Sequence, residues 1–248
     1  MGFISHLFYP WGLILQAVAI VHFIRRRPDG YWLWIILALG PLGALVYIVM
    51  EMVPDVGGMG QSFKMFPRRK RIARLRIEIL DNPSAGNFEE LGDLLMEDGK
   101  LQQARDAFDK AIAGLGYSLD ARYRRGVCAL QLGDAAAAVP DLELVVRKDR
   151  RFDFYRAAGL LAHAYALAGE KVKAEALFVE VTLASTSSET YLNFAQLLAS
   201  EGRTAEAREW AKKVLDKKPT MPGYLRRRER SWFRKAYGLL ARLRLQSK

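Results

Sequence analysis

The chain has 248 residues, of which 51% are hydrophobic, and its formal net charge is +11. This hydrophobic content excludes a disordered chain, and the length allows one or two domains. The single cysteine, Cys128, excludes an intrachain disulfide and leaves the cellular compartment open.

Two apolar runs open the chain. Leu7–Ile24 is interrupted only by two strongly polar residues, and Tyr31–Met50 contains no charge. The second run has about 20 residues, enough to cross the hydrocarbon core, and the first is near the lower limit. Because the connection Arg25–Gly30 is short, we expect residues 1–53 to form a transmembrane two-helix anchor. A cleaved signal peptide fits poorly, since the arginines follow the first run and do not precede it.

Several residues of this hairpin match the membrane segment at the front of another protein family. They are Arg25, Arg26, Arg27, Gly30, Trp32, Pro41, Leu42, Gly43 and Tyr47. On these residues the segment resembles the N-terminal anchor of cardiolipin synthases of the phospholipase D family, over about residues 8–52. The resemblance implies an anchor without catalysis, because no His is followed two residues later by the Lys that the family's chemistry requires.

Residues 54–83 are expected to form a linker and a basic amphipathic helix. Pro and Gly residues mark the linker, and seven basic residues against one acidic residue give residues 61–80 a charge of +6. Ile72, Leu75 and Ile79 share one helix face. The helix could lie on anionic lipid through Arg68, Arg69, Lys70 and Arg71, or it could cap the first repeat.

Residues 84–221 repeat one pattern four times, in which a Gly precedes a small Ala by five residues. The pairs are Gly99 and Ala104, Gly133 and Ala138, Gly169 and Ala174, and Gly202 and Ala207. Successive glycines are 34, 36 and 33 residues apart, which is the period of a helix–turn–helix repeat. Each Gly can end a first helix in the left-handed conformation, and each Ala permits close crossing by the second helix.

This pattern resembles the tetratricopeptide repeat family, which implies an all-α solenoid of about four helix pairs. Two departures stand out. Arg122 and Arg125 replace bulky apolar residues, so we expect the second repeat to pack loosely. Two extra residues near Arg147–Phe154 are expected to lengthen a turn or a helix end.

Residues 222–248 are expected to form a basic capping helix from about Tyr224 to Leu245, since a repeat array must cover its last apolar face. The predicted apolar face contains Trp232, Phe233, Ala236, Tyr237, Leu240 and Leu243. The basic face, which includes Arg226, Arg227 and Arg228, leaves contact with lipid or with an acidic partner open.

No phosphate-binding loop, metal-ligand spacing or nucleophile motif occurs in the sequence. We therefore predict that the protein is not an enzyme and has no catalytic residue, cofactor or metal site. Cys128 is interpreted as a packing residue, and His163 as a groove-facing or partly buried side chain.

The resemblance places the first helix of each repeat on an inner surface, where a partner protein or peptide would bind. The residues predicted there are Glu89, Asp93, Met96, Tyr123, Val127, Leu130, Arg156, His163, Leu192 and Gln196. The Asn and Lys pattern that grips a peptide's C-terminal carboxylate in some relatives is absent.

Together these features predict a scaffold or adaptor that is integral to a bacterial inner membrane and presents a peptide-binding groove beside the bilayer. The Arg triplet and the basic residues 61–80 give opposing signals for sidedness. The resemblance to the synthase anchor slightly favours cytoplasmic repeats. The alternative is a lipid-associated accessory of phospholipid or envelope metabolism, whose basic helices bind anionic lipid. Nucleic-acid binding is not expected. The partner's identity and the oligomeric state are left open.

Overall fold

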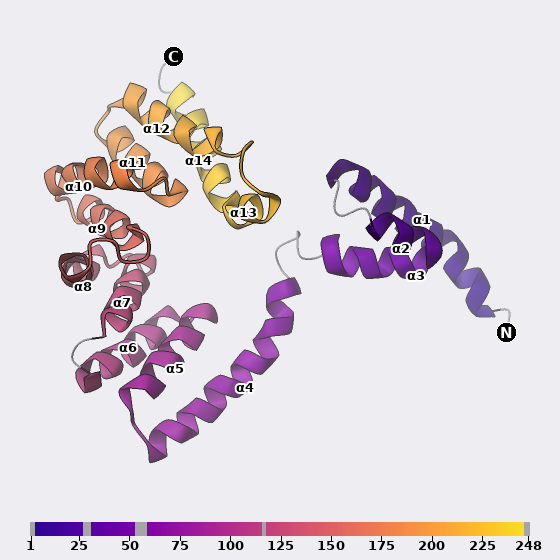
Figure 1. The fold of residues 1–248 in the computed structure, drawn as a ribbon, viewed down its shortest axis with the longest axis horizontal. Helices are drawn as coiled ribbons and strands as arrows, with labels where there is room; N and C mark the ends of the chain where they lie inside the picture. Colours follow the sequence, from indigo (N-terminus) through magenta and orange to yellow (C-terminus); the bar gives the residue numbers. More distant parts are fainter. Residues whose placement is uncertain (1–2, 27–30, 53–58, 116–117, 246–248) are drawn as a thin grey trace. The chain divides into compact units, whose positions relative to one another are not determined.

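The structure is a computed structural model that describes residues 3–26, 31–52, 59–115 and 118–245, and all regular elements in these ranges are helical (Figure 1). The chain divides into two compact units, Met1–Arg69 and Lys70–Lys248. Helix α4 (Met59–Asp81) contains the boundary between them.

The first unit contains α1 (Phe3–Arg26), α2 (Tyr31–Ala38), α3 (Gly40–Tyr47) and a short π-helix, η1 (Ile48–Met52). Helix α3 packs against both α1 and α2. Ala19, Trp32, Ile36, Ala44 and Tyr47 form the core. The Trp32 and Tyr47 rings meet edge to face, with 5.5 Å between their centroids.

The second apolar run forms two short helices in place of the expected long one. The break lies at Gly40, which is left-handed (φ 55°), and Pro41 follows at the start of α3. Helices α2 and α3 have eight residues each, so each is about 12 Å long against a hydrocarbon core of about 30 Å.

Helix α1 has 24 residues. Among the described residues, no helix combines the length and the apolar character needed to cross a membrane. The predicted transmembrane hairpin of residues 1–53 is therefore wrong, and so is the predicted integral location in a bacterial inner membrane. The resemblance to the cardiolipin synthase anchor finds no support.

The second part of α4 covers the first repeat. Ile72 and Leu75 are buried in one core with Leu91, Leu95 and Phe108. Arg71 donates from Nε and Nη2 to Glu90, at 2.7 and 2.8 Å. Of the two arrangements that the sequence left open for this helix, the structure contains the capping one. Of the predicted linker, residues 54–58 lie outside the described residues, and α4 begins at Met59.

Four antiparallel helix pairs follow, and their bounds agree with the repeat pattern. They are α5 (Ala85–Glu97) with α6 (Leu101–Leu115), α7 (Leu119–Gln131) with α8 (Ala135–Lys148), α9 (Arg156–Leu167) with α10 (Lys171–Ala184), and α11 (Ser188–Ser200) with α12 (Thr204–Asp216). The turn glycines Gly99, Gly133, Gly169 and Gly202 all have φ between 76° and 86°. The four marker alanines are fully buried, which confirms the predicted helix crossings.

Two helices close the array: α13 (Gly223–Arg228) and α14 (Arg230–Leu245). Helix α14 packs on α11 and α12 and buries Phe233, Ala236, Leu239 and Leu243. Tyr237, which we expected on the buried face, is 53% exposed, and Leu239 lies there instead. Arg208 of α12 donates to the Leu243 carbonyl at 2.5 Å, near the end of α14.

The connection between α8 and α9, where extra residues were expected, is a left-handed turn. Asp153, Phe154 and Tyr155 have φ of 48°, 52° and 66°. Neighbouring contacts fix it: the Phe152 ring lies 5.1 Å from the Tyr123 ring, and the Tyr123 hydroxyl donates to Asp153 at 2.8 Å. The extra residues therefore lengthen this turn.

Candidate functional site

The first helices of the repeats line the inner side of the array. Each of α5, α7 and α9 contacts the next first helix along the chain, and α11 contacts α14. For the described residues, the backbones of the second helices α6, α8, α10 and α12 do not approach one another in the same way. An array whose first helices approach one another while its second helices diverge curves toward the first helices (Figure 1).

Polar side chains join successive first helices on this inner side. Between α5 and α7, Arg124 pairs with Asp93 at 2.8 Å and Ser118 donates to Glu89 at 3.2 Å. Arg156 Nε then donates to Glu189 of α11 at 2.9 Å. We call these residues, with the Tyr123–Asp153 bond, the inner polar row: Glu89, Asp93, Ser118, Tyr123, Arg124, Asp153, Arg156 and Glu189. The row ties each repeat to the next and so fixes their spacing.

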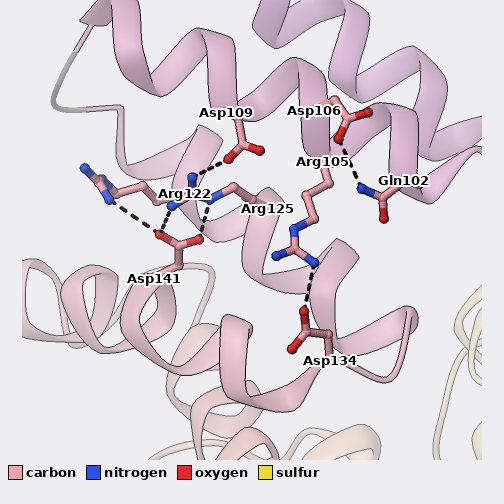
Figure 2. A network of polar contacts seen from close by, with 8 residues as sticks. All are labelled: Gln102, Arg105, Asp106, Asp109, Arg122, Arg125, Asp134 and Asp141. Atoms are coloured by element: carbon pink, nitrogen blue, oxygen red, sulfur yellow. Dashed lines mark hydrogen bonds and ion pairs between the residues drawn. The ribbon is translucent and has the colours of Figure 1, made fainter.

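A buried ion network holds α7, which lies in the middle of this surface. Figure 2 shows Asp141 of α8 between Arg122 and Arg125 of α7. Asp141 is 3% exposed and accepts from Arg125 Nε and Nη2, both at 2.6 Å. Arg122 Nη1 lies 3.4 Å from the same carboxylate, and Arg125 also donates to Asp109 of α6 at 2.5 Å. The expected loose packing of this repeat is therefore wrong, because the two arginines share a carboxylate that replaces the apolar contact.

A second pair in the same view fixes the start of α8. Arg105 of α6 donates to Asp134 at 2.9 Å, and Asp134 accepts the amide of Ala137 as the N-cap of α8 (Figure 2). The backbone bond and the arginine together lower the pKa of Asp134. The first and second repeats are thus connected by two sets of contacts, one between α5 and α7 and the other between α6 and the start of α8.

Family models for the tetratricopeptide repeat match residues 89–152 and 188–220. The chain contains tetratricopeptide repeats. The two matched ranges contain three of the four helix pairs, and the pair α9 and α10 lies between them with the same Gly and Ala markers.

Solved tetratricopeptide structures share the fold. YrrB, a tetratricopeptide protein with an unusual peptide-binding site, is 20% identical, with a TM-score of 0.55 over 69% of this chain and 90% of its own. MamA from Desulfovibrio magneticus RS-1 (residues 41 to the end) is 20% identical, with a TM-score of 0.58 over 63% of this chain and 88% of its own. TTC0263, a thermophilic tetratricopeptide protein from Thermus thermophilus, is 20% identical, with a TM-score of 0.51 over 71% of this chain and 93% of its own. No curated protein sequence matches the chain.

The tetratricopeptide array distributes the ten predicted groove residues among three environments. Glu89, Asp93, Tyr123 and Arg156 belong to the inner polar row. Met96, Val127, Leu130, His163 and Gln196 lie on first helices and are partly buried. Leu192 is fully buried and therefore belongs to the core of the fourth repeat.

Burial shifts the pKa values of Asp93 and His163 on this surface. It raises the pKa of Asp93, against the opposing effect of Arg124, and the nearby carboxylates Glu89, Glu97 and Asp120 raise it further. It also lowers the pKa of His163, an effect that Glu189 opposes and Lys235 of α14 reinforces. The inner surface is thus rich in acidic residues along α5 and the start of α7.

Sequence reasoning missed half of the inner polar row: Ser118, Arg124, Asp153 and Glu189. One signal was available, because Asp120, Arg156 and Glu189 each lie 13 residues before the turn Gly of their repeats and alternate in charge. Comparing equivalent positions would have paired Arg156 with Glu189. Asp153 lies in the left-handed turn, which the repeat frame does not position.

The basic residues that we expected to face lipid occupy separate helices. Arg68, Arg69, Lys70 and Arg71 belong to α4, where Arg71 is bound to Glu90, while Arg226, Arg227 and Arg228 belong to α13 and are exposed. The alternative role in lipid association rested on the transmembrane hairpin and on these basic helices; the transmembrane hairpin is not found among the described residues, and the role finds no support.

Cys128 is a packing residue of the first two repeats. Its side chain is fully buried beside the core residues Ala104, Ala121 and Leu95. Burial raises the pKa of its thiol to about 11. The thiol therefore stays protonated at neutral pH and is a poor nucleophile.

Proposed function

We propose that the protein is a non-catalytic scaffold whose tetratricopeptide array binds an extended segment of another protein on its inner surface. This proposal rests on the inner side of the array. There, partly exposed apolar and polar side chains of four successive first helices lie next to one another. YrrB, which has the same fold, has a peptide-binding site.

The charges on this surface indicate the chemistry of the bound segment. Asp93 lies among three further carboxylates and has one arginine partner, Arg124, at 2.8 Å. A Lys or Arg of the partner would relieve the repulsion among these carboxylates. Met96, Val127 and Leu130 would contact apolar side chains of the same segment. We therefore propose a partner segment in which basic and apolar residues alternate.

The test is selection of a random peptide library against the full-length chain, followed by binding measurements on the selected peptides. We expect basic and apolar residues to be enriched, and Asp93→Asn to weaken binding about tenfold, the effect of losing one partly buried charge contact. Asp106→Asn is the matched control, because Asp106 is exposed on the outer helix α6. Equal effects of the two substitutions would contradict binding at the inner surface.

A second pair of variants tests the apolar part of the surface. Val127→Asp places a charge on the inner face of α7, and we expect it to abolish measurable binding of the same peptides. Ala113→Asp on α6 introduces the same side chain at an exposed outer position and should leave binding unchanged. Thermal unfolding of both variants controls for loss of fold.

A further inference from the structure

Helix α10 differs from the other second helices in its solvent-exposed face. Val172 and Leu183 are each 86% exposed and Val179 is 48% exposed. Ala176 is exposed between them. We call these four residues the α10 stripe.

The stripe is one continuous face of the helix. Its residues are spaced by four, three and four positions, which places them in a row along one side. The opposite side, made of Ala174, Leu177, Phe178 and Val181, packs into the core. Helix α10 is therefore apolar on two opposite faces, and the repeat fold uses only one of them.

The other repeats show what this face normally carries. Counted from the marker alanines, the equivalent positions are Gln102, Asp106, Asp109 and Ala113 in α6, Ala136, Pro140, Glu143 and Arg147 in α8, and Ala205, Glu209, Lys212 and Asp216 in α12. All twelve are exposed, and each of these three helices has at least two charged residues there. The third repeat has none, so its outer face is an exception within one chain and does not follow from the fold.

We propose that the α10 stripe is a self-association surface, on which α10 of a second copy packs antiparallel across a two-fold axis. In this register Val172 faces Leu183 of the second copy and Ala176 faces Val179, so every stripe residue meets an apolar partner. Spacings of four and three residues are those of a coiled-coil seam, which keeps such a row facing its partner. This interface lies on the outer side of the array and is separate from the proposed peptide-binding surface.

The charges beside the stripe favour a second copy over an unrelated helix. Lys173 and Glu180 lie on one flank of the stripe, and the antiparallel register places Lys173 of one copy next to Glu180 of the other, twice in the dimer. A self-complementary pattern of this kind is what a two-fold interface requires.

Both residues already have partners within the chain: Lys173 pairs with Glu170 at 2.5 Å, and Glu180 pairs with Arg150. The dimer would join these pairs into a row of alternating charge. In the row, Arg150 and Glu180 of one copy are followed by Lys173 and Glu170 of the second copy. An open cleft of ≈ 320 Å³, bordered by Lys173, Ala176 and Glu180, adds room for side chains of the second copy on this flank.

The size of the stripe sets the expected strength of the dimer. Residues 172–183 span about 18 Å of helix, which buries less than the roughly 1,600 Å² of a standard interface. We therefore expect weak self-association, with a Kd on the order of 100 μM.

Sedimentation velocity of the full-length chain over a concentration series tests the proposal. Leu183→Lys should raise the dimer Kd at least about tenfold, since it places two lysines in an apolar seam. Leu80→Lys is the matched control, because Leu80 in α4 is 82% exposed and lies off the stripe. A wild-type chain that stays monomeric to about 1 mM, or an equal effect of the two substitutions, overturns the proposal.

Cross-linking locates the contact. Ala176→Cys lies beside the proposed two-fold axis and should give a dimer with a short bismaleimide, whereas Ala113→Cys, the equivalent exposed position of α6, should not. The native Cys128 is fully buried, so the bismaleimide should react only with the introduced cysteine. A cross-link at position 113 and none at 176 would exclude the stripe as the interface.

A charge exchange distinguishes this register from other helix pairings. Lys173→Glu and Glu180→Lys should each raise the Kd severalfold, because each places like charges side by side across the interface. The double variant should recover the wild-type Kd. Failure of the double variant to recover, while its thermal unfolding matches that of the single variants, overturns the antiparallel register.

Discussion

The second and fourth repeats have different kinds of side chain at three equivalent positions beside the helix crossing. The side chains are charged in the second repeat and aromatic in the fourth. In the second repeat, Arg122 and Arg125 precede the turn glycine by eleven and eight residues, and Asp141 follows it by eight. The same three positions of the fourth repeat hold an aromatic cluster, Tyr191, Phe194 and Trp210. The Trp210 ring lies 5.2 Å from the ring of Tyr191 and 5.1 Å from that of Phe194.

This difference shows which part of the repeat is fixed and which part is exchangeable. Both repeats have the same left-handed turn, at Gly133 and Gly202, and the same fully buried crossing alanine, Ala138 and Ala207. The space beside the crossing holds a bidentate ion pair in one repeat and an aromatic cluster in the other, and the three positions differ together. A carboxylate is compatible with burial here because two arginines face it.

The largest expected effect is on the second repeat. Asp141→Ala leaves the partly buried guanidinium groups of Arg122 and Arg125 without their shared carboxylate. Breaking a buried pair of this kind costs about 3–5 kcal/mol, so we expect a large decrease in the free energy of unfolding in urea titrations. A loss below about 1 kcal/mol would show that the network is not a structural element.

A transplant of the fourth-repeat residues sharpens this test. The triple variant Arg122→Tyr, Arg125→Phe and Asp141→Trp should recover most of the stability that Asp141→Ala loses, since well-packed apolar residues often replace a buried ion pair at no cost. The double variant Arg122→Tyr and Arg125→Phe keeps an unpaired Asp141 and should remain unstable. Equal stability of the double and triple variants would contradict exchange of the three positions as a set.

Removing one side chain from the aromatic cluster of the fourth repeat should cost less stability than removing Asp141 from the second repeat. Trp210 is only partly buried, so Trp210→Ala should cost about 2–3 kcal/mol, at the low end for removal of a large aromatic side chain. The measurement is again the urea midpoint and slope. A cost above that of Asp141→Ala would reverse the order that the two environments predict.

The N-cap serines of α7 and α11 are equivalent residues of the two repeats, and we expect their removal to have a smaller effect on stability. Ser118 caps α7 by accepting the amide of Ala121 at 3.1 Å and also donates to Glu89, whereas Ser187 caps α11 by accepting the amide of Thr190 at 3.5 Å. We expect Ser118→Ala to cost about 1 kcal/mol and Ser187→Ala about half as much. Equal costs would mean that the bond to Glu89 contributes no stability.

The smallest effect concerns pH. Burial holds the pKa of His163 below its ordinary value of 6.5, so the unfolded chain binds this proton more readily than the folded chain. The resulting stability is fully present above pH 6.5 and is lost as the pH falls through the folded pKa. His163→Gln should flatten the dependence of the urea midpoint on pH between about 5 and 7. An unchanged profile would assign that dependence to other groups.

Features that depend on neighbouring residues could be predicted from the sequence. The turn glycines and crossing alanines were correct because a left-handed C-cap and a close helix crossing each require a particular residue type at a particular position. The number of apolar residues predicted the transmembrane hairpin, whereas the structure divides the second run at Gly40 and Pro41 into two helices of eight residues each.

The tertiary structure decided which side chains from different helices meet. Asp141 lies 16 residues after Arg125, and Glu189 lies 33 residues after Arg156, so neither pair is visible in local periodicity. It also decided that the outer face of α10 is uncovered, because the sequence shows an apolar residue but not whether another helix buries it. Local sequence determines the backbone of each repeat, since turns and helix crossings are short-range, whereas charge pairing and exposure depend on how the helices pack on one another.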